Sequence, residues 1–352
     1  MIPEHRPTRL PVFLASLLSK LYSIGINHRN RQYDKGVGVT RLDRPVISIG
    51  NLSTGGTGKT PLVQYLVRHL IENGHTPCIA MRGYKSKPSE IGDEQQEHMN
   101  ALPGVPIVAQ PDRIAGLQEM FETEEGKGID CVVLDDGFQH RKIARDLDIV
   151  VIDASRPPYQ DALLPLGFLR EQAASLCRAD MVVISHAEMV EQEQLGECRR
   201  WVDQRVSPET AVAVVEHCWE QVHEYRVAAH TPLLHPIEYL DGKPVAVLTG
   251  IGHPVAFAAM AIGAGAQIVH RCDRPDHDNF SDAVFELFMS DARSQGAASV
   301  LATMKDWTKL SSRFEGANPG DWLPVIVPGL GLRFRSGQAE FDTGSLTIYE
   351  RV

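Results

Sequence analysis

A glycine-rich segment between a β-branched run and a helical pattern constrains the fold of this chain more than any other feature. Residues 45–50 predict a short buried strand, and residues 51–60 read Asn-Leu-Ser-Thr-Gly-Gly-Thr-Gly-Lys-Thr. Apolar residues then recur with helical spacing from Leu62 to Ile71, between a first-turn Pro61 and a terminating Gly74. In this order, the backbone N–H groups at the start of the helix converge on a bound phosphate group.

The polar residues of this loop match the needs of a nucleotide. Lys59 supplies a positive charge for phosphate, Thr60 supplies a hydroxyl for Mg²⁺, and Asn51 either fixes the loop or contacts phosphate. The P-loop pattern has glycine five residues before Gly58, where this chain has a serine, so the match is a variant, and a purely structural turn is the alternative. We assign nucleotide binding to Asn51, Ser53, Thr54, Gly55, Gly56, Thr57, Gly58, Lys59 and Thr60.

A carboxylate that binds Mg²⁺ together with Thr60 is expected at the end of a later buried strand. The apolar run 131–134 ends in Asp135 and Asp136, and we assign the metal to one or both of them; a solvated strand end is the alternative. Further strands are expected at 77–81, 105–109, 148–152 and 181–184, a helix at 112–122, and a polar loop at 83–97. This alternation predicts an α/β fold, a P-loop parallel sheet with helices on both faces.

The segment after the last of these strands bears on the choice of nucleotide. A GTPase typically has Asn-Lys-x-Asp there, whereas this chain has Ser185-His186-Ala187-Glu188. We therefore expect ATP rather than GTP.

Charge is unevenly distributed along the chain. The net charge is −10, which disfavours a general nucleic-acid binder, but residues 1–44 hold eight basic and three acidic residues. Within them, residues 10–26 predict an amphipathic helix whose apolar face lies at an anionic membrane surface. A helix packed on its own domain and a signal peptide or anchor are the alternatives.

Composition shifts predict three parts. Residues 1–35 are expected to form the N-terminal amphipathic membrane-associated helix, residues 36–225 the P-loop domain, and residues 226–352 a second, smaller α/β domain. A connector is expected at 217–236, where Thr231-Pro232 and His235-Pro236 interrupt the pattern, and a polar hairpin at 331–352. No protein partner is evident.

The sequence closely resembles the tetraacyldisaccharide 4'-kinases, the lipid A 4'-kinases of Gram-negative bacteria. The resemblance covers the chain from the N-terminal helix to about residue 330. It departs at Gln95-Gln96-Glu97-His98, where the family usually has proline and leucines, and at Met304, where it usually has glutamate. The motifs that carry it are 50–61, Arg82-Gly83-Tyr84, Gly92-Asp93-Glu94, 134–140, 164–171, Asp276-His277 and Lys305-Asp306.

The resemblance implies transfer of the ATP γ-phosphate to the 4'-hydroxyl of a tetraacylated glucosamine disaccharide 1-phosphate, a lipid A precursor, at the cytoplasmic face of the inner membrane. Lys59 is then assigned to the β and γ phosphates, and Arg170 to the charge that develops on the γ-phosphate. The resemblance makes Asp93 the acceptor of the sugar hydroxyl proton, paired with His277.

Three further residues of these motifs are expected near the ligands. Gln139 and His140 either reach the nucleotide or sugar or cap the next helix, and Glu171 either pairs with Arg170 or faces the metal. Two other functions are alternatives: a membrane-docked P-loop ATPase that acts as a nucleotide-gated interaction protein, and a small-molecule kinase of similar architecture.

Overall fold

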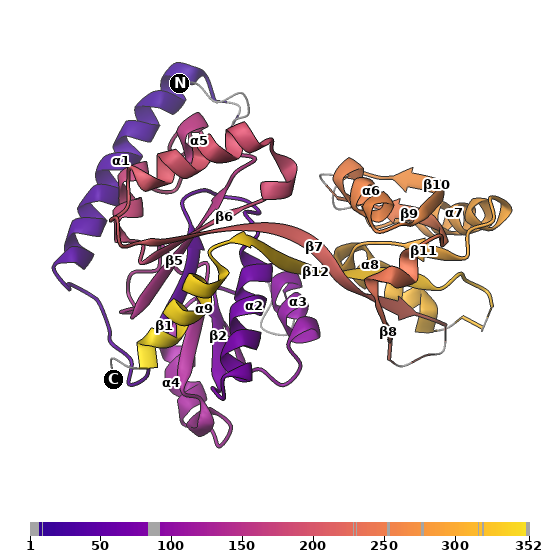
Figure 1. Cartoon of the computed structure of the whole chain (residues 1–352), viewed down its shortest axis with the longest axis horizontal. Coiled ribbons are helices and arrows are strands. Elements are labelled where there is room, and N and C mark those ends of the chain that lie inside the picture. Colours follow the sequence, from indigo (N-terminus) through magenta and orange to yellow (C-terminus); the bar gives the residue numbers. More distant parts are fainter. Residues whose placement is uncertain are drawn as a thin grey trace. The chain divides into compact units, whose positions relative to one another are not determined.

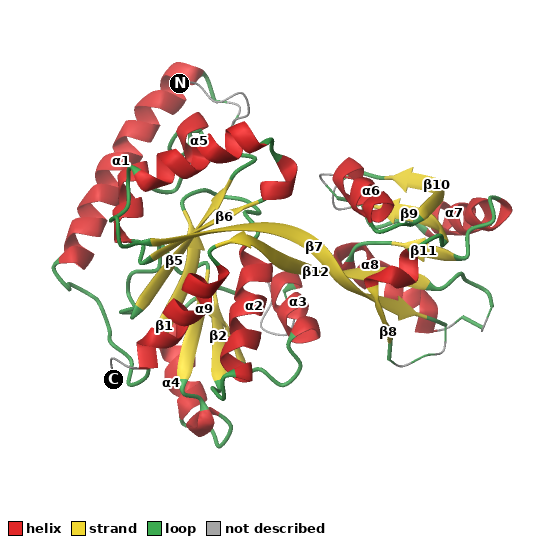
Figure 2. Ribbon diagram, in the orientation of Figure 1, coloured by secondary structure: helices red, strands yellow, loops and turns green. Residues whose placement is uncertain are grey.

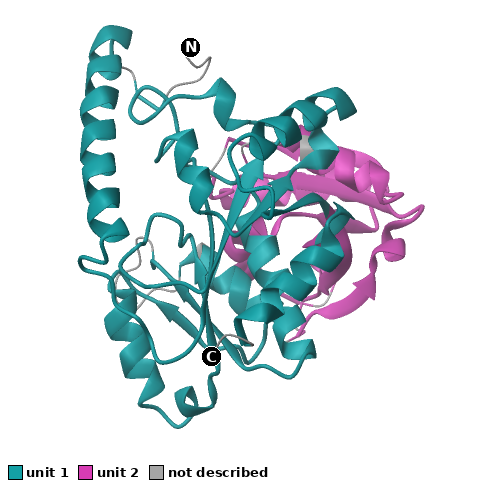
Figure 3. Cartoon of the chain, turned by 60° about the vertical axis from the view of Figure 1, so that its left-hand side comes forward, with its two compact units in different colours: residues 1–217, 332–352 teal, residues 218–331 magenta. Residues whose placement is uncertain are grey.

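The chain divides into two compact units in a computed structural model. Unit 1 comprises residues 1–217 and 332–352, and unit 2 comprises residues 218–331 (Figure 3). Helices and strands alternate along most of the chain (Figure 1, Figure 2). The structure describes residues 7–8, 10–83, 92–227, 229, 231–251, 254–275, 278–315, 317–318 and 320–349.

Unit 1 is built on a parallel sheet with the order β3-β2-β4-β1-β5-β6-β7. Strands β1, β2, β4, β5 and β6 are mostly apolar and buried along their whole length, because both faces of the sheet are covered by the rest of the unit. The predicted parallel α/β sheet is confirmed. Its strands are β1 (Val46–Asn51), β2 (Pro77–Met81), β3 (Ile107–Ala109), β4 (Cys131–Asp135), β5 (Leu147–Asp153), β6 (Met181–Ser185) and β7 (Ala211–Tyr225).

Helices cover both faces of this sheet, as predicted. On one face, α2 (Lys59–Glu72) and α9 (Gln338–Leu346) share a core with the strands, although they are far apart in the sequence (Figure 1). On the other face, α4 (Arg113–Phe121) and α5 (Gln192–Asp203) pack against alternate strand residues. Helix α3 (Asp93–Ala101) is the next described element after β2 in the chain. Short 3₁₀ turns are η1 (Gly126–Gly128), η2 (Pro158–Gln160), η3 (Ala173–Arg178), η4 (Ala187–Met189) and η6 (Thr347–Tyr349).

The carboxyl ends of the central strands meet at one edge of the sheet. Strand β1 lies between β4 and β5, with Ile49 beside Asp135 and Asn51 beside Val151. The chain reverses its direction of winding at β1, and such a switch point is where parallel α/β sheets bind ligands. Gly50 is required there, because a Cβ atom would lie 2.5 Å from the backbone nitrogen of Phe138.

Unit 2 is a smaller α/β unit, as predicted. Strands β9 (Pro244–Thr249), β10 (Gln267–Asp273), β11 (Ser299–Leu301) and β12 (Val325–Ser336) are parallel neighbours in the order β10-β9-β11-β12. Helices α7 (Asp282–Ser294) and α8 (Met304–Glu315) pack on one face and α6 (Pro254–Gly263) on the other. The 3₁₀ turn η5 covers Ile237–Leu240.

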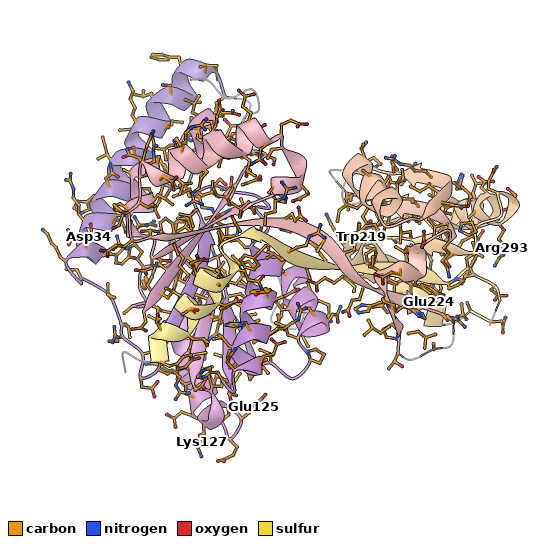
Figure 4. All side chains as sticks on the ribbon, in the orientation of Figure 1. Asp34, Glu125, Lys127, Trp219, Glu224 and Arg293 are labelled. Atoms are coloured by element: carbon orange, nitrogen blue, oxygen red, sulfur yellow. The ribbon has the colours of Figure 1, made fainter. Side chains whose placement is uncertain are left out.

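Three local expectations were wrong. The expected connector at 217–236 is largely strand, because Trp219 and Glu224 lie on the long β7, which pairs with β8 (Leu233–Pro236) (Figure 4). The expected polar hairpin at 331–352 is the end of β12 followed by α9, whose Phe341 is buried in unit 1; residues 332–352 therefore belong to that unit and not to the second. The expected loop 83–97 ends in α3, which begins at Asp93.

The N-terminal helix α1 (Val12–Asp34) packs on unit 1 through its polar side chains. Ser19 Oγ donates to the Leu163 carbonyl at 3.0 Å, Tyr22 Oη to the Arg170 carbonyl at 3.0 Å, and Asn30 Nδ2 to Glu171 at 2.7 Å. The apolar face of α1 is exposed instead: Phe13 is 83% and Ile24 66% accessible. Among the described residues, no helix combines the length and apolarity needed to cross a bilayer.

Candidate functional site

The phosphate loop joins β1 to α2, and side chains of Asn51 and Ser185 form hydrogen bonds that hold it in place. Gly55 and Gly58 adopt φ values of 112° and 76°, which side chains disfavour and glycine allows. Asn51 Nδ2 donates to Thr57 Oγ1 at 2.7 Å, and Ser185 Oγ donates to the Thr57 carbonyl at 2.8 Å. Asn51 therefore fixes the loop, the first of the two roles that the sequence allowed.

Three charged side chains meet where the loop enters α2. Lys59, the first residue of α2, places Nζ 3.5 Å from Asp136 Oδ1, and Arg170 donates to Asp136 Oδ2 at 2.6 Å. Burial alone would raise the pKa of Asp136, but Lys59 and Arg170 outweigh it and hold that pKa below its usual value. The carboxylate is therefore ionised, and the cluster keeps one net positive charge beside the loop.

A short antiparallel pairing brings Arg170 to this place. Thr54 N donates to the Phe168 carbonyl at 2.8 Å, and Arg170 N donates to the Leu52 carbonyl at 2.7 Å. Gln139 links the same elements, because its Nε2 donates to the Asn51 carbonyl at 2.8 Å and its Oε1 accepts from Arg170 at 3.2 Å. The structure thus gathers side chains from positions 59, 136, 139 and 170 around one loop.

The adjacent carboxylate, Asp135, has a different environment. It ends β4, and its Oδ2 lies 3.0 Å from Nε2 of the fully buried His98 on α3. Asp136 turns away from the strand with φ 53° and faces Lys59. The two neighbouring carboxylates, which the sequence did not distinguish, therefore point to different partners.

His140 and Glu171 are held within the protein framework. Burial lowers the pKa of His140 to about 4, and Arg113 and Arg145 add to the effect, so its ring is neutral at physiological pH. Glu171 is fully buried and accepts hydrogen bonds from Asn30 and from Arg178, the latter at 3.0 Å. Arg178 and Asn30, rather than Arg170, are the residues that pair with it.

Of the two residues assigned to the acceptor side, one is described only in its backbone and the other is not described. Asp93 is the first residue of α3, and its side chain lies outside the described part of the chain. His277 and Tyr84 also lie outside the described residues.

The residues at the loop fit a nucleotide with its magnesium ion. Asp136 Oδ1 is buried and accepts no hydrogen bond within the described residues; Lys59 Nζ lies 3.5 Å away, so this oxygen keeps lone-pair capacity for a bound cation. The candidate ligand atoms are the carboxylate oxygens of Asp135 and Asp136 and the hydroxyl of Thr60, which follows Lys59 on α2, all of the hard-oxygen type that Mg²⁺ prefers. Lys59 and Arg170 supply the cations that a triphosphate needs.

Sequence reasoning missed two residues that shape this site. His98 falls in the segment where the sequence departs from the family pattern, and only its contact with Asp135 reveals its place. Ser185 was noted only as the polar end of a strand, a signal that was sufficient to place it at the ligand edge but not to predict its bond to Thr57.

The fold and the site define a P-loop nucleotide-binding protein. A family model described as tetraacyldisaccharide-1-P 4'-kinase matches residues 12–341. The chain belongs to this family, which confirms the resemblance that the sequence motifs gave.

Similar proteins extend over most of the chain. A tetraacyldisaccharide 4'-kinase from Anaeromyxobacter sp. (strain K) is 35% identical over 85% of this chain and 81% of that protein. Its counterpart from Chlorobaculum parvum is 28% identical over 98% and 95%. The crystal structure of LpxK from Aquifex aeolicus in complex with ATP matches with a TM-score of 0.69 and 28% identity, covering 95% of this chain and 96% of that one.

Proposed function

We propose that this protein transfers the γ-phosphate of ATP to the 4'-hydroxyl of a tetraacylated glucosamine disaccharide 1-phosphate, the lipid A precursor. The observation that carries the proposal is the cluster of Lys59, Asp136 and Arg170 at the phosphate loop of a chain in this kinase family. Phosphoryl transfer has a loose transition state, so catalysis depends on positioning and on neutralising charge. A loop flanked by two cations and an ionised carboxylate supplies both.

Each residue of the loop then has a role. The backbone N–H groups of residues 55–60 bind phosphate oxygens at the N-terminus of α2, and Lys59 neutralises the β and γ phosphates. Thr60 and Asp136, with Asp135 next to Asp136 in the chain, would hold Mg²⁺. Arg170 stabilises the charge that develops on the transferred group. Bound ATP supplies the phosphoryl group, and Mg²⁺ screens its charge.

The acceptor side of the reaction is assigned to Asp93 and His277. Asp93 accepts the proton of the 4'-hydroxyl, and His277 is its partner, as the family resemblance implies. Asp93 begins α3, and His98, five residues further along the same helix, contacts Asp135, so α3 is tied to the phosphate end of β4. This tie supports the assignment of Asp93 to a reacting position.

Replacing Asp93 by alanine is expected to lower kcat by about 10²–10⁴, the usual contribution of a general base, and to leave ATP affinity unchanged. Steady-state kinetics at saturating lipid and nucleotide titrations measure the two effects. Glu193→Ala, which removes a first-turn carboxylate from α5, is the control. A D93A protein with the full rate at saturating lipid would refute the role of Asp93.

A label-transfer assay tests the function itself. With γ-labelled ATP and the tetraacylated disaccharide 1-phosphate, we expect label in the lipid and little free phosphate. A nucleotide-gated interaction protein would instead release labelled inorganic phosphate without labelling the lipid. Transfer only to water-soluble acceptors would support the small-molecule kinase and contradict our proposal.

We also propose that α1 holds the enzyme on the anionic surface of the membrane that contains its substrate, at the cytoplasmic face of the inner membrane. The polar side chains of α1 bind unit 1, while Phe13, Leu21 and Ile24 remain exposed. A helix of this kind lies in the interface with its apolar side among acyl chains. The basic residues of positions 1–44 add attraction to anionic headgroups.

Leu21→Glu is expected to weaken binding to anionic vesicles by about 10-fold or more, since a buried leucine contributes about 1.5–3 kcal/mol. Co-sedimentation with phosphatidylglycerol vesicles measures the partition. Ile71→Glu, at an exposed apolar position on α2, is the matched control and should bind as the wild type does. Equal partition of all three proteins would exclude α1 as the membrane contact.

A further inference from the structure

Two histidines and a glutamate form a compact cluster beneath the phosphate loop. His186 and Glu188 follow β6, and His217 lies on β7, so adjacent strands supply the three side chains. His186 Nδ1 lies 3.4 Å and His217 Nδ1 lies 3.5 Å from the same oxygen, Glu188 Oε1. The two imidazole rings are tilted, with centroids 4.3 Å apart, and the candidate ligand atoms all lie within 4.8 Å of one another.

The backbone orients Glu188 for this arrangement. The backbone N–H of His217 donates to Glu188 Oε2 at 3.1 Å. That bond occupies one carboxylate oxygen and leaves Oε1 facing both imidazole rings. The position of the acceptor oxygen is therefore fixed by the strand that carries the second histidine.

The buried ring nitrogens of His217 have no hydrogen-bond partner within the described residues. The residue is only 8% exposed. A buried polar group without a partner costs about 1–3 kcal/mol. Because Nδ1 of this ring faces Glu188 Oε1 at 3.5 Å, the unpaired nitrogen is directed into the cluster.

Two of the three ligand separations match those of a tetrahedral metal site, and the third is no more than 4.8 Å. Zinc binds histidine nitrogen and carboxylate oxygen at about 2.0–2.2 Å, so two ligands of a tetrahedral ion lie about 3.4 Å apart. The distances from Glu188 Oε1 to His186 and His217 are 3.4 and 3.5 Å. We propose that His186, Glu188 and His217 bind a divalent transition-metal ion of the zinc class.

The donor set separates this ion from the magnesium of the kinase reaction. Two imidazoles and one carboxylate favour Zn²⁺ or Co²⁺, whereas Mg²⁺ prefers oxygen ligands and octahedral geometry. Three protein ligands leave a fourth position for water or another ligand. The side chains of His186 and Glu188 are 19% and 28% exposed, so that position is open to solvent.

The site adjoins the phosphate loop directly. A Cβ atom on Gly58 would lie 2.3 Å from His217 Nε2, so the imidazole ring packs against the backbone of the loop. Ser185, next to His186, holds the Thr57 carbonyl. A metal ion here joins the segment after β6 to the middle of β7 next to the loop, and its binding goes beyond the kinase activity proposed above.

Cobalt titration of the full chain tests the site without nucleotide or lipid, so its result does not depend on the kinase assignment. After treatment with a chelator, one equivalent of Co²⁺ should give the intense visible absorption of a four-coordinate ion, and Zn²⁺ should abolish it by displacement. Glu188→Gln and His217→Gln should each weaken Co²⁺ affinity by at least about 10-fold, because even outer-shell partners of a metal site are worth about 10–100-fold.

His75→Gln is the matched control, since His75 lies 3.0 Å from Asp130 in another histidine–carboxylate pair of unit 1 and should leave the absorption unchanged. His186→Gln, at a position whose side chain is 19% exposed, provides a third variant that leaves the buried ring of His217 in place. Zn²⁺ should also raise the Tm of the wild type more than that of the variants, because the three ligands are brought together only in the folded protein. Absent absorption at one equivalent, or equal Co²⁺ affinity in wild type and all three variants, would overturn the proposal.

Discussion

Replacing Lys59 by alanine is expected to lower kcat/KM for lipid phosphorylation by about 10³. An added cation at a transferring phosphoryl group, such as an arginine finger, is worth about 10³–10⁵ in kcat. Lys59 is the first residue of α2, and its Nζ lies 3.5 Å from Asp136 Oδ1, so its positive charge lies where the loop meets the helix. Arg170 remains in the variant and prevents a complete loss.

Steady-state kinetics of K59A with varied ATP separate binding from catalysis. Most of the loss should appear in kcat, because the charge on the γ-phosphate spreads in the transition state. Lys127→Ala is the control, since Lys127 pairs with Glu124 in the turn after α4, outside the phosphate loop (Figure 4). A K59A protein within threefold of the wild-type rate would contradict the assignment of Lys59.

Asp136→Asn should lower kcat by about 10²–10³, because metal stabilisation of transition-state charge contributes several kcal/mol and about 1.4 kcal/mol corresponds to a factor of ten. The same change removes the negative charge that lies between Lys59 and Arg170. In the absence of Mg²⁺, the variant should therefore bind ATP at least as tightly as the wild type. Binding and catalysis are thus expected to change in opposite directions.

Nucleotide titrations with and without Mg²⁺ resolve these two effects. The Mg²⁺ concentration for half-maximal rate should rise in D136N. Asp34→Asn is the matched control (Figure 4). Asp34, at the end of α1, accepts a hydrogen bond from Arg141 at 2.7 Å, so its substitution removes a similar ion pair elsewhere in unit 1. Unchanged Mg²⁺ dependence in D136N would assign the metal to another residue.

Local patterns predicted the elements that are apolar throughout. Strand β2 has the predicted bounds, Pro77–Met81, and β6 extends the predicted run by one residue. Such runs can be recognised in a sequence because strands buried on both faces have few polar residues. The second half of β7 was read as a connector, since residues 217–225 mix polar and apolar side chains and prolines follow. Their strand conformation depends on pairing with β8 and β12, which composition does not reveal.

The prediction for the C-terminal segment was wrong for a related reason. Residues 338–346 contain few apolar side chains, so they gave no strong periodic signal. Phe341 and Ile348 nevertheless complete the core beneath α2 and β1. A segment whose few apolar residues fill a gap left by distant elements cannot be recognised until those elements are in place.

The order of strand, glycine loop and helix was by itself sufficient to predict that this chain binds a phosphate chain at residues 51–60, because such binding resides in backbone N–H groups and a short run of consecutive residues. The tertiary structure decided the electrostatics. It separated Asp135, bound to His98, from Asp136, bound to Lys59 and Arg170. It also turned the apolar face of α1 outward and placed His217 against Gly58. These are contacts between residues far apart in the chain, and Coulomb and packing energies depend on separation in space, which sequence spacing does not give.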